Sequence, residues 1–435
     1  MLRRILTGVV LMITSCVAIP IVSSSSAGAS GFSWSIVPTP NPSSSPNNNL
    51  FGVACTSSSN CWAVGLASSG SGGITQTLAE LWNGAAWSIV TTPDVISSGG
   101  DTLDGVTCVS SSDCWAVGSY TPPGLPVEDT QTLAEHWNGA AWSIVTTPNP
   151  NPLDSRGFLG VACVASSDCW AVGSGFIGGG GTRGPLAEHW NGSAWSIVAT
   201  DNPSFVNNQL SGVTCINTSD CWAVGFALTG NFDQTSQTFA DHWNGAAWSI
   251  VTTPNTSPLQ TNQLGGVSCA SSSDCWAVGF GDVVAGVAQT LAEHWDGSSW
   301  SIVETPNTNS TNDAFSDVSC LGSSDCWAVG FGDVVAGVGQ TLAEHWNGIA
   351  WSIVTTPNTS PSQSNELNGV ICNSSSDCWA VGFGDVVAGV PQTLAEHGTM
   401  SATPKTKQQC MQGGWLSYSQ FKNQGQCVRF VNNGK

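Results

Sequence analysis

Acidic residues outside the repeated motifs of this sequence are the side chains that could do chemistry. Two carboxylates at a suitable separation can hydrolyse a glycosidic bond, one as acid and the other as nucleophile or base. Loop carboxylates can also bind Ca²⁺ through their oxygens. The candidates are Glu128, Asp129, Asp154, Asp233, Asp282, Asp333 and Asp385. No spacing selects a pair and no EF-hand spacing occurs, so we predict no catalytic residue, no cofactor and no metal site, with Ca²⁺ binding as the alternative.

All six histidines and seven further acids occupy two adjacent positions of a repeated segment. The histidines are His136, His189, His242, His294, His345 and His397, with Leu81 at that position in the first unit. The acids just before them are Glu80, Glu135, Glu188, Asp241, Glu293, Glu344 and Glu396. A metal site needs ligands that converge, whereas one histidine per repeat keeps them apart. We therefore predict structural roles, in which each histidine bonds a neighbouring backbone group or carboxylate.

Two more sets of residues recur beside the cysteines. One set is predicted to cap Ser-rich turns by accepting hydrogen bonds from backbone N–H groups: Asp113, Asp168, Asp220, Asp274, Asp325 and Asp377, with Asn60 in the first unit. The other set consists of Trp62, Trp115, Trp170, Trp222, Trp276, Trp327 and Trp379. Rows of aromatic rings can stack on sugars, but identical placement in every unit favours packing between neighbouring sheets.

Sixteen of the 17 cysteines pair by position, Cys16 being the exception. Fourteen have the spacing C-x5-C: Cys55 and Cys61, Cys108 and Cys114, Cys163 and Cys169, Cys215 and Cys221, Cys269 and Cys275, Cys320 and Cys326, Cys372 and Cys378. The last two, Cys410 and Cys427, lie near the C-terminus. An even number in an exported chain is typical of disulfides, whereas a zinc site needs four ligands and each unit offers two. We predict eight disulfides.

The cysteine pairs also reveal the elements that must position these residues. Their first members recur every 51 to 55 residues, the length expected for a propeller blade. Seven units start near residues 51, 104, 159, 211, 265, 316 and 368. Each contains the motifs GVxC, CWAVG and TLAEH with small variations, and the first six continue into WNG, or WDG in the fifth, and then WSIV. Short segments rich in Val, Ile, Trp and Thr, separated by Ser, Asn-Gly and Pro, are typical of strands. We predict an all-β fold, a seven-bladed β-propeller of four-stranded antiparallel blades.

The two ends of the repeat complement each other. Residues 33–38 contain an extra WSIV before the first unit, whereas the seventh unit stops at Gly398 without one. If the first strand completes the last blade, the ring closes and no long sheet edge is left open. We therefore predict that the N-terminal strand joins blade seven and that residues 30–398 form the propeller.

These motifs resemble those of a known repeat family. CWAVG followed by WNGxxWSIV, over residues 33–397, is similar to the kelch-type propeller repeat and to secreted bacterial proteins built from CWAVG and WNGxxWS repeats. One glycine, as at Gly118, stands where kelch repeats have two, and the cysteine pair is an addition. The resemblance implies a scaffold for binding, with enzymes in the minority.

The variable segments of the units are expected to share one side of the ring. In an antiparallel blade, the connections between second and third strands and the linkers between blades lie opposite the short turns. These connections vary in length and content, whereas the short turns are nearly invariant. Because loops on a rigid scaffold often bind ligands, we predict that this side is the binding face, with drift of unconstrained loops as the alternative. Its candidate residues are Glu128, Asp129, Arg183, Asp233, Asp282, Asp333 and Asp385.

Composition excludes several functions. Nine basic residues face 29 acids, for a formal net charge of −20, which excludes nucleic acid as a partner. Between residues 30 and 400 the only basic side chains are Arg156 and Arg183, too few for a sialidase-like site that holds a carboxylate with several arginines. Tyr120 is the only tyrosine there, which excludes copper–tyrosine oxidation chemistry.

Both ends of the chain carry separate signals. Residues 1–29 combine two arginines, an apolar stretch and an Ala-Gly-Ala end, the pattern of a signal peptide; a lipoprotein acylated at Cys16 is the alternative. After a linker at 399–404, residues 405–435 carry five basic residues and no acid. The segment from Cys410 to Val431, which includes FKNQGQCV at 421–428, resembles a short C-terminal module of many secreted bacterial proteins, which implies no particular function. We predict that this basic module contacts anionic cell-wall polymers or lipid headgroups, with docking on the acidic propeller as the alternative.

These features predict a secreted or cell-surface monomer that binds a glycan or a protein and does no chemistry of its own. A glycan-cleaving hydrolase or lyase that uses loop carboxylates is the alternative, and a purely structural surface protein is a third possibility.

Overall fold

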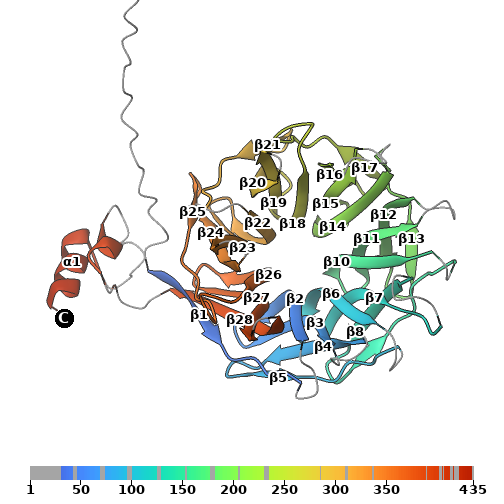
Figure 1. The fold of residues 1–435 in the computed structure, drawn as a ribbon, viewed down its shortest axis with the longest axis horizontal. Coiled ribbons are helices and arrows are strands. Elements are labelled where there is room, and N and C mark those ends of the chain that lie inside the picture. Colours follow the sequence, from blue (N-terminus) through green and yellow to red (C-terminus); the bar gives the residue numbers. More distant parts are fainter. Residues whose placement is uncertain are drawn as a thin grey trace, which may run out of the picture.

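The computed structural model describes residues 31–42, 47–68, 74–95, 100–124, 129–151, 154–176, 182–203, 206–229, 235–284, 286–308, 312–335, 338–387, 389–400, 404, 406–411, 415 and 421–433. The strands form seven four-stranded antiparallel sheets, arranged as blades around one axis (Figure 1). The predicted seven-bladed propeller is confirmed. The predicted signal peptide, residues 1–29 with Cys16, lies outside the described residues.

Every blade has the same strand order from the axis outward, and blades 1 to 7 are numbered along the chain. The first strands are β2 (Asn47–Ser57), β6 (Asp101–Ser110), β10 (Arg156–Ala165), β14 (Val206–Asn217), β18 (Asn262–Ser271), β22 (Asp313–Gly322) and β26 (Asn365–Ser374). The second strands are β3 (Asn60–Ser68), β7 (Asp113–Tyr120), β11 (Asp168–Phe176), β15 (Asp220–Leu228), β19 (Asp274–Val284), β23 (Asp325–Val335) and β27 (Asp377–Val387). The third strands are β4 (Thr75–Trp82), β8 (Gln131–Trp137), β12 (Arg183–Trp190), β16 (Ser236–Trp243), β20 (Val287–Trp295), β24 (Val338–Trp346) and β28 (Val390–Met400). The fourth, outermost strands are β5 (Trp87–Ile89), β9 (Trp142–Ile144), β13 (Trp195–Val198), β17 (Trp248–Val251), β21 (Trp300–Val303), β25 (Trp351–Ile353) and, for blade 7, β1 (Phe32–Val37).

Each first strand carries a β-bulge in the stretch that lines the axis. In blade 1 the pairing of β2 with β3 shifts between Leu50 and Gly52, and the other six blades shift at the equivalent position. The CWAVG glycine of the second strand makes room for this bulge, because a Cβ on Gly65 would lie 1.9 Å from the carbonyl oxygen of Asn49. Only glycine fits so close to a neighbouring backbone.

Tryptophans pack the blades against one another. Trp62 of blade 1 is fully buried, and its ring centroid lies 4.8 Å from that of Trp137 and 4.9 Å from that of Trp142 in blade 2. Equivalent clusters occupy the other six junctions. Each ring removes on the order of 150–250 Å² from water, so the recurring tryptophans form the core between sheets, as predicted.

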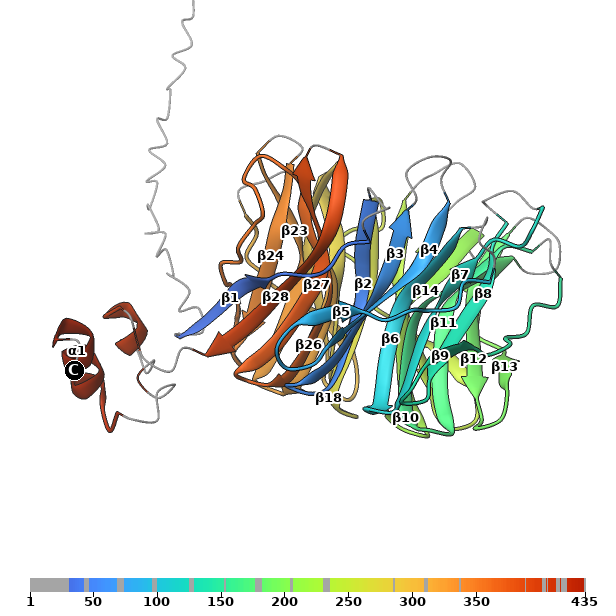
Figure 2. The ribbon, with the colours of Figure 1, turned by 90° about the horizontal axis from the view of Figure 1, so that it is seen from below.

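The N-terminal strand closes the ring. β1 pairs with β28 along its whole length, and Trp34 faces Gly398 where the other blades have facing tryptophans. The ring of Phe32 occupies the space of the missing tryptophan, since a Cβ on Gly398 would lie 2.6 Å from that ring. Figures 1 and 2 show β1 lying along β28. The predicted closure is confirmed.

Eight disulfides link the predicted cysteine pairs. Within each blade the two cysteines face each other across the first and second strands, as do Cys55 and Cys61 with a Cα–Cα distance of 4.0 Å. The eighth, Cys410–Cys427, joins a short 3₁₀ helix, η1 (Gln408–Cys410), to the helix α1 (Gln424–Asn433), which the sequence did not predict. Eight disulfides are typical of an extracellular, oxidising environment. Within the described ranges, no helix combines the length and apolar character needed to span a bilayer.

Candidate functional site

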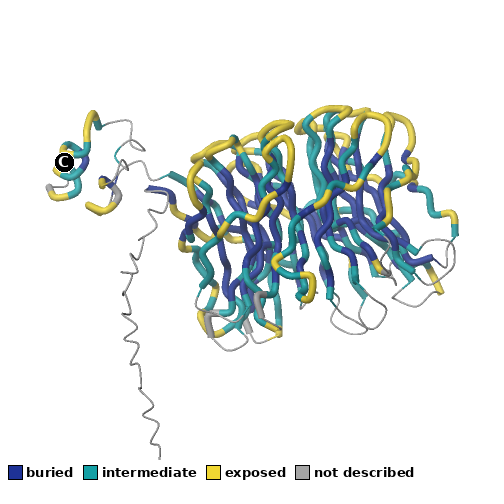
Figure 3. The backbone as a smooth tube through the Cα atoms, turned by 90° about the horizontal axis from the view of Figure 1, so that it is seen from above, coloured by how far each residue is buried: buried dark blue, intermediate teal, exposed yellow. Residues whose placement is uncertain are grey.

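The ring has two unlike faces. The turn face carries the Ser-rich turns and the Asn-Gly turns, which touch each other, since Trp137 Nε1 donates to the Ser111 carbonyl oxygen at 3.2 Å. The loop face carries the connections between second and third strands and the linkers between blades. Figure 3 shows exposed residues at the short turns of the turn face and buried residues in the middle of the blades.

On the turn face the histidines bond carboxylates. His136 Nε2 lies 2.8 Å from Asp113 Oδ1, and the other five histidines make the same contact within their blades. This confirms the predicted structural role of the histidines and corrects that of Asp113 and its equivalents. The turn is capped instead by a serine, since the Ser112 amide donates to Ser110 Oγ at 3.3 Å. The aspartate begins the second strand, where the imidazole of the third strand reaches it.

The acids that precede the histidines form a ring of buried carboxyls at the blade junctions. All seven are 0% exposed: Glu80, Glu135, Glu188, Asp241, Glu293, Glu344 and Glu396. Thr238 of blade 4 donates to Glu293 Oε1 of blade 5 at 3.3 Å, which places that carboxyl between two sheets. Removal from water disfavours a charged carboxylate. These acids therefore act in packing and have no access to a ligand.

Burial raises the pKa of every carboxyl in this ring. The pKa of Glu135 rises to about 9, mainly through burial and further through the negative charges of Asp94 and Asp101. Burial also raises the pKa of Glu80, Glu188 and Glu293 to about 8 and that of Asp241 to about 7, and it holds those of Glu344 and Glu396 well above the ordinary value. Most of these acids are consequently neutral at pH 7.

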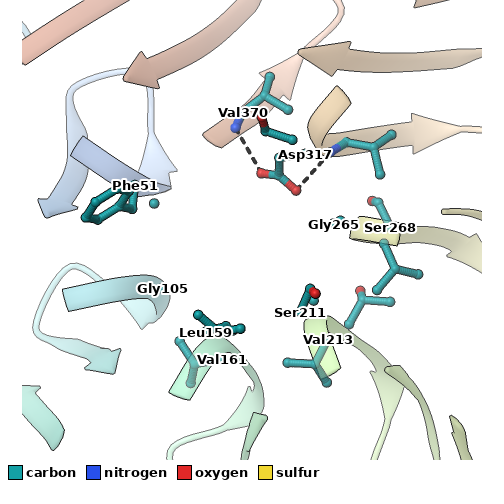
Figure 4. Close-up of a pocket in the computed structure, with 18 of the residues that line it drawn as sticks. Phe51, Gly105, Leu159, Val161, Ser211, Val213, Gly265, Ser268, Asp317 and Val370 are labelled. Atoms are coloured by element: carbon teal, nitrogen blue, oxygen red, sulfur yellow. Dashed lines mark hydrogen bonds between the residues drawn. The ribbon is translucent and has the colours of Figure 1, made fainter. Parts of the chain in front are cut away.

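The bulged residues line a channel of about 310 Å³ along the axis (Figure 4). Six blades have glycine just after the bulge, whereas blade 6 has Asp317. Asp317 accepts hydrogen bonds from the Val318 amide at 2.8 Å and from the Val370 amide of blade 7 at 3.0 Å. Burial raises its pKa to about 6, although these two bonds act in the opposite direction. Asp317 therefore ties blade 6 to blade 7.

A second carboxyl, Asp104 of blade 2, also lines the channel. Thr102 donates to its Oδ2 at 3.1 Å, and burial raises its pKa to about 7. Neither Asp104 nor Asp317 was among the residues predicted from the sequence. Their signal was present, because the residue before GVxC differs between units and blade 6 alone has an aspartate in place of the glycine of GVxC.

Three predicted loop aspartates lie on the loop face, one in each of blades 5, 6 and 7. Asp282, Asp333 and Asp385 occupy equivalent positions near the ends of β19, β23 and β27, where the second and third strands run on into a tight hairpin instead of a loop. Two are engaged locally: Asn312 Nδ2 donates to Asp333 Oδ2 at 3.0 Å, and the Gly389 amide donates to Asp385 Oδ2 at 3.3 Å. The structure therefore places them in separate blades.

The remaining predicted acids do not come together in one site either. Asp129 is half-buried just before β8, and Asp154 pairs with Arg156 at 3.7 Å. Glu128 and Asp233 lie outside the described residues. In the part of the chain that the structure describes, no group of three His, Cys, Asp or Glu side chains is arranged to hold a metal ion.

Arg183 lines a groove of about 400 Å³ on the loop face between blades 3 and 4. Its Nη2 donates to Ser155 Oγ at 3.1 Å, and its guanidinium carbon lies 5.2 Å from the centre of the Phe176 ring. Blade 4 supplies the opposite wall, which includes Asn207 and Phe226. Arg183 is thus the one predicted site residue that the structure places in a groove with aromatic and amide side chains, as judged over the described residues.

These features define a disulfide-linked, seven-bladed β-propeller with an asymmetric groove on one face. No protein-family model and no curated protein match the sequence. Solved structures do match the fold. YCF48 bound to a D1 peptide aligns with a TM-score of 0.50 and 12% identity, over 84% of this chain and 94% of that chain.

Two further solved structures align with lower scores. A GH74 xyloglucanase from Xanthomonas campestris aligns with a TM-score of 0.49 and 11% identity, over 83% of this chain and 55% of that chain. The lectin SapL1 in complex with alpha methyl fucoside aligns with a TM-score of 0.43 and 13% identity, over 71% of this chain and 95% of that chain. At such identities the likeness shows the fold alone.

Proposed function

We propose that this protein is a secreted, non-catalytic scaffold that binds a glycan or a surface protein through its loop face. The observation that carries the proposal is the groove of Arg183, in which a cationic side chain, aromatic rings and amides converge on one hollow. A few polar groups among apolar walls are typical of ligand pockets. The repeated acids and histidines, by contrast, are engaged within the ring and leave binding to the residues that differ between blades.

The alternative is a glycan-cleaving enzyme, and one observation favours it. Asp104 and Asp317 line the axial channel and have pKa values raised to about 7 and 6. A general acid works best when its pKa lies near the working pH. Both oxygens of Asp317 already accept backbone hydrogen bonds, however, which supports a structural role for this carboxyl.

An array of glycans and peptides, probed with the full-length protein, tests the proposal when it is combined with product analysis. We expect a bound glycan or peptide to remain uncut over a long incubation. New reducing ends that disappear in Asp104→Asn would instead establish the enzyme, and the Asp333→Asn variant serves as a control of equal charge change on the loop face. A protein that binds nothing across the array contradicts a binding function.

The basic C-terminal module is proposed to hold the propeller at an anionic cell-wall polymer or lipid surface. Lys422 and Arg429 are exposed there, and such attraction falls with ionic strength. Cell association of the full chain should therefore weaken with salt and should decrease in a Lys422→Gln, Arg429→Gln variant. Association that is unchanged in this variant at low salt contradicts the proposal and favours docking of the module on the propeller.

A further inference from the structure

We propose that the groove between blades 3 and 4 binds the carboxylate of an acidic sugar, so that the ligand is a uronate-containing polysaccharide. The inference rests on the proposed function and names the class of ligand for that site. Its basis is a guanidinium that has no carboxylate partner among the described residues and is held in place from several sides, in a propeller that contains only one other arginine.

Charge distinguishes blade 3 from the other blades. Arg156 and Arg183 are the only lysine or arginine residues between 30 and 400, and both belong to blade 3. Arg156 is engaged, because its Nη2 lies 3.7 Å from Asp154 Oδ2 and donates to the Phe176 carbonyl oxygen at 3.2 Å. Arg183 has no carboxylate within 4 Å among the described residues. In a chain with 29 acids, an arginine without an acidic partner is available to an external anion.

Two contacts fix the position of the Arg183 side chain before an anion binds. Its guanidinium rests on the Phe176 ring, a cation–π contact, and one N–H bonds Ser155. A guanidinium has five N–H donors in a fork that matches a carboxylate, so most of them remain for the ligand. Its backbone amide donates to Asn207 Oδ1 of blade 4 at 3.2 Å, which ties the two walls of the groove together.

The groove walls suit a sugar ring beside that charge. Phe226 and Leu228 are half-buried and offer apolar surface to the C–H faces of a sugar, while Gln209 and the exposed Asn207 offer amides to its hydroxyls. Asn207 has φ +59°, the left-handed conformation, and is the only non-glycine residue with positive φ in the described ranges. Such conformations concentrate at binding sites. The volume of about 400 Å³ falls in the range of ligand pockets.

The repeat itself shows that this arrangement is specific to blade 3. Phe176 and Arg183 face each other across β11 and β12. The same two positions hold Leu228 and Ser236 in blade 4, and Asp282 and Ala288 in blade 5. An aspartate in place of the phenylalanine repels an anion, so the hairpins of blades 5 to 7 do not offer an equivalent site. Arg183→Ser is the least disruptive substitution, because blade 4 has a serine, Ser236, at the equivalent position.

Calorimetric titration of the full-length protein tests the inference. The probes are oligomers of galacturonate, glucuronate and mannuronate, each compared with the same oligomer after methyl esterification of its carboxylates. We expect at least one free acid to bind, and its ester to bind about 10- to 100-fold more weakly, the loss expected for one charge-assisted pair. Arg183→Ser should weaken binding of the acid by a similar factor and leave binding of the ester unchanged.

Control variants separate the groove from other sources of binding. Asp333→Asn should leave the affinity unchanged, and the Lys422→Gln, Arg429→Gln variant tests the basic module. Arg183→Lys keeps the charge but lacks the forked N–H donors of a guanidinium, and it should bind with intermediate affinity. An unchanged thermal unfolding midpoint shows that Arg183→Ser folds normally.

Two outcomes overturn the inference: free acids that bind no better than their esters, or binding that is lost in the module variant and retained in Arg183→Ser. If uronates fail while neutral glycans or peptides bind, this inference is wrong and the proposed function stands; if nothing binds, both fail.

Discussion

Replacing Glu135 by Gln tests whether the ring of buried acids holds protons at neutral pH. Burial raises the pKa of Glu135 from 4.5 to about 9, so the folded protein keeps a proton that the unfolded chain releases above about pH 4.5. Because the folded state binds more protons than the unfolded state, the free energy of unfolding falls as pH rises. The contribution is fully present below pH 4.5 and is lost progressively up to about pH 9.

The size of this effect follows from the shift. One pH unit corresponds to about 1.4 kcal/mol for each proton that is bound in only one state. Between pH 5 and pH 8 the carboxyl of Glu135 should therefore lower the free energy of unfolding by about 4 kcal/mol. Glutamine stays neutral throughout, so the Glu135→Gln protein should gain about this amount relative to the parent over the same interval.

Urea denaturation with the disulfides intact, at pH 5, 6, 7 and 8, measures this difference. Glu304→Gln is the matched control, because it makes the same substitution at an exposed acid in the linker after β21. A constant difference in unfolding free energy between Glu135→Gln and the parent from pH 5 to pH 8 would refute the reasoning, since it would mean that the carboxyl titrates normally in the folded state.

Three further predictions concern positions at which one blade departs from the others. Leu81→His combined with Asn60→Asp should create the missing pair in blade 1, with a coupling of about 0.5–1 kcal/mol in a double-mutant cycle of urea unfolding; purely additive effects contradict the pairing. Asp317→Asn puts an amide NH₂ against a backbone N–H donor and should lower the unfolding free energy by about 1–3 kcal/mol, whereas an unchanged value means that its two hydrogen bonds contribute nothing. Gly398→Trp should lower the thermal unfolding midpoint by displacing the Phe32 ring, and adding Phe32→Ala should restore part of it; no recovery argues against the packing of β1.

Most of the fold could be predicted because the sequence repeats. A residue found at one place in every unit has the same neighbours in every unit, so the cysteine spacing and the extra Trp34 segment were sufficient to predict the disulfides and the closure. The His–Asp pair also had a signal, since blade 1 lacks both partners at once, with Asn60 and Leu81 in their places. Local turn chemistry was the wrong principle for Asp113, because the partner lies 23 residues away on another strand.

The candidate site was harder to predict because it depends on contacts between blades. Nothing along the chain indicates that Arg183 lies beside Asn207 of the next blade, since that requires the stagger of neighbouring sheets. The bulge that turns Asp104 and Asp317 toward the axis likewise depends on a register shift between strands. The loop aspartates were predicted because they are acidic and lie in variable segments. Neither property distinguishes a residue at the end of a hairpin from a residue that contacts a ligand.

The buried acids also bear on whether so acidic a protein can bind an acidic ligand. The formal net charge of −20 counts every carboxyl as charged, whereas burial raises the pKa of Glu80, Glu135, Glu188 and Glu293 to about 8 or 9. With these four neutral at pH 7, 25 acids face nine basic residues and the net charge is −16. At physiological ionic strength a charge acts over about 8 Å, so a carboxylate in the groove responds mainly to Arg183 and little to acids on distant blades. Nucleic-acid binding differs, because it draws on many Lys and Arg contacts at once. The proposed anion site therefore depends on one guanidinium that has no carboxylate partner among the described residues, and the charge of distant blades does little to oppose it.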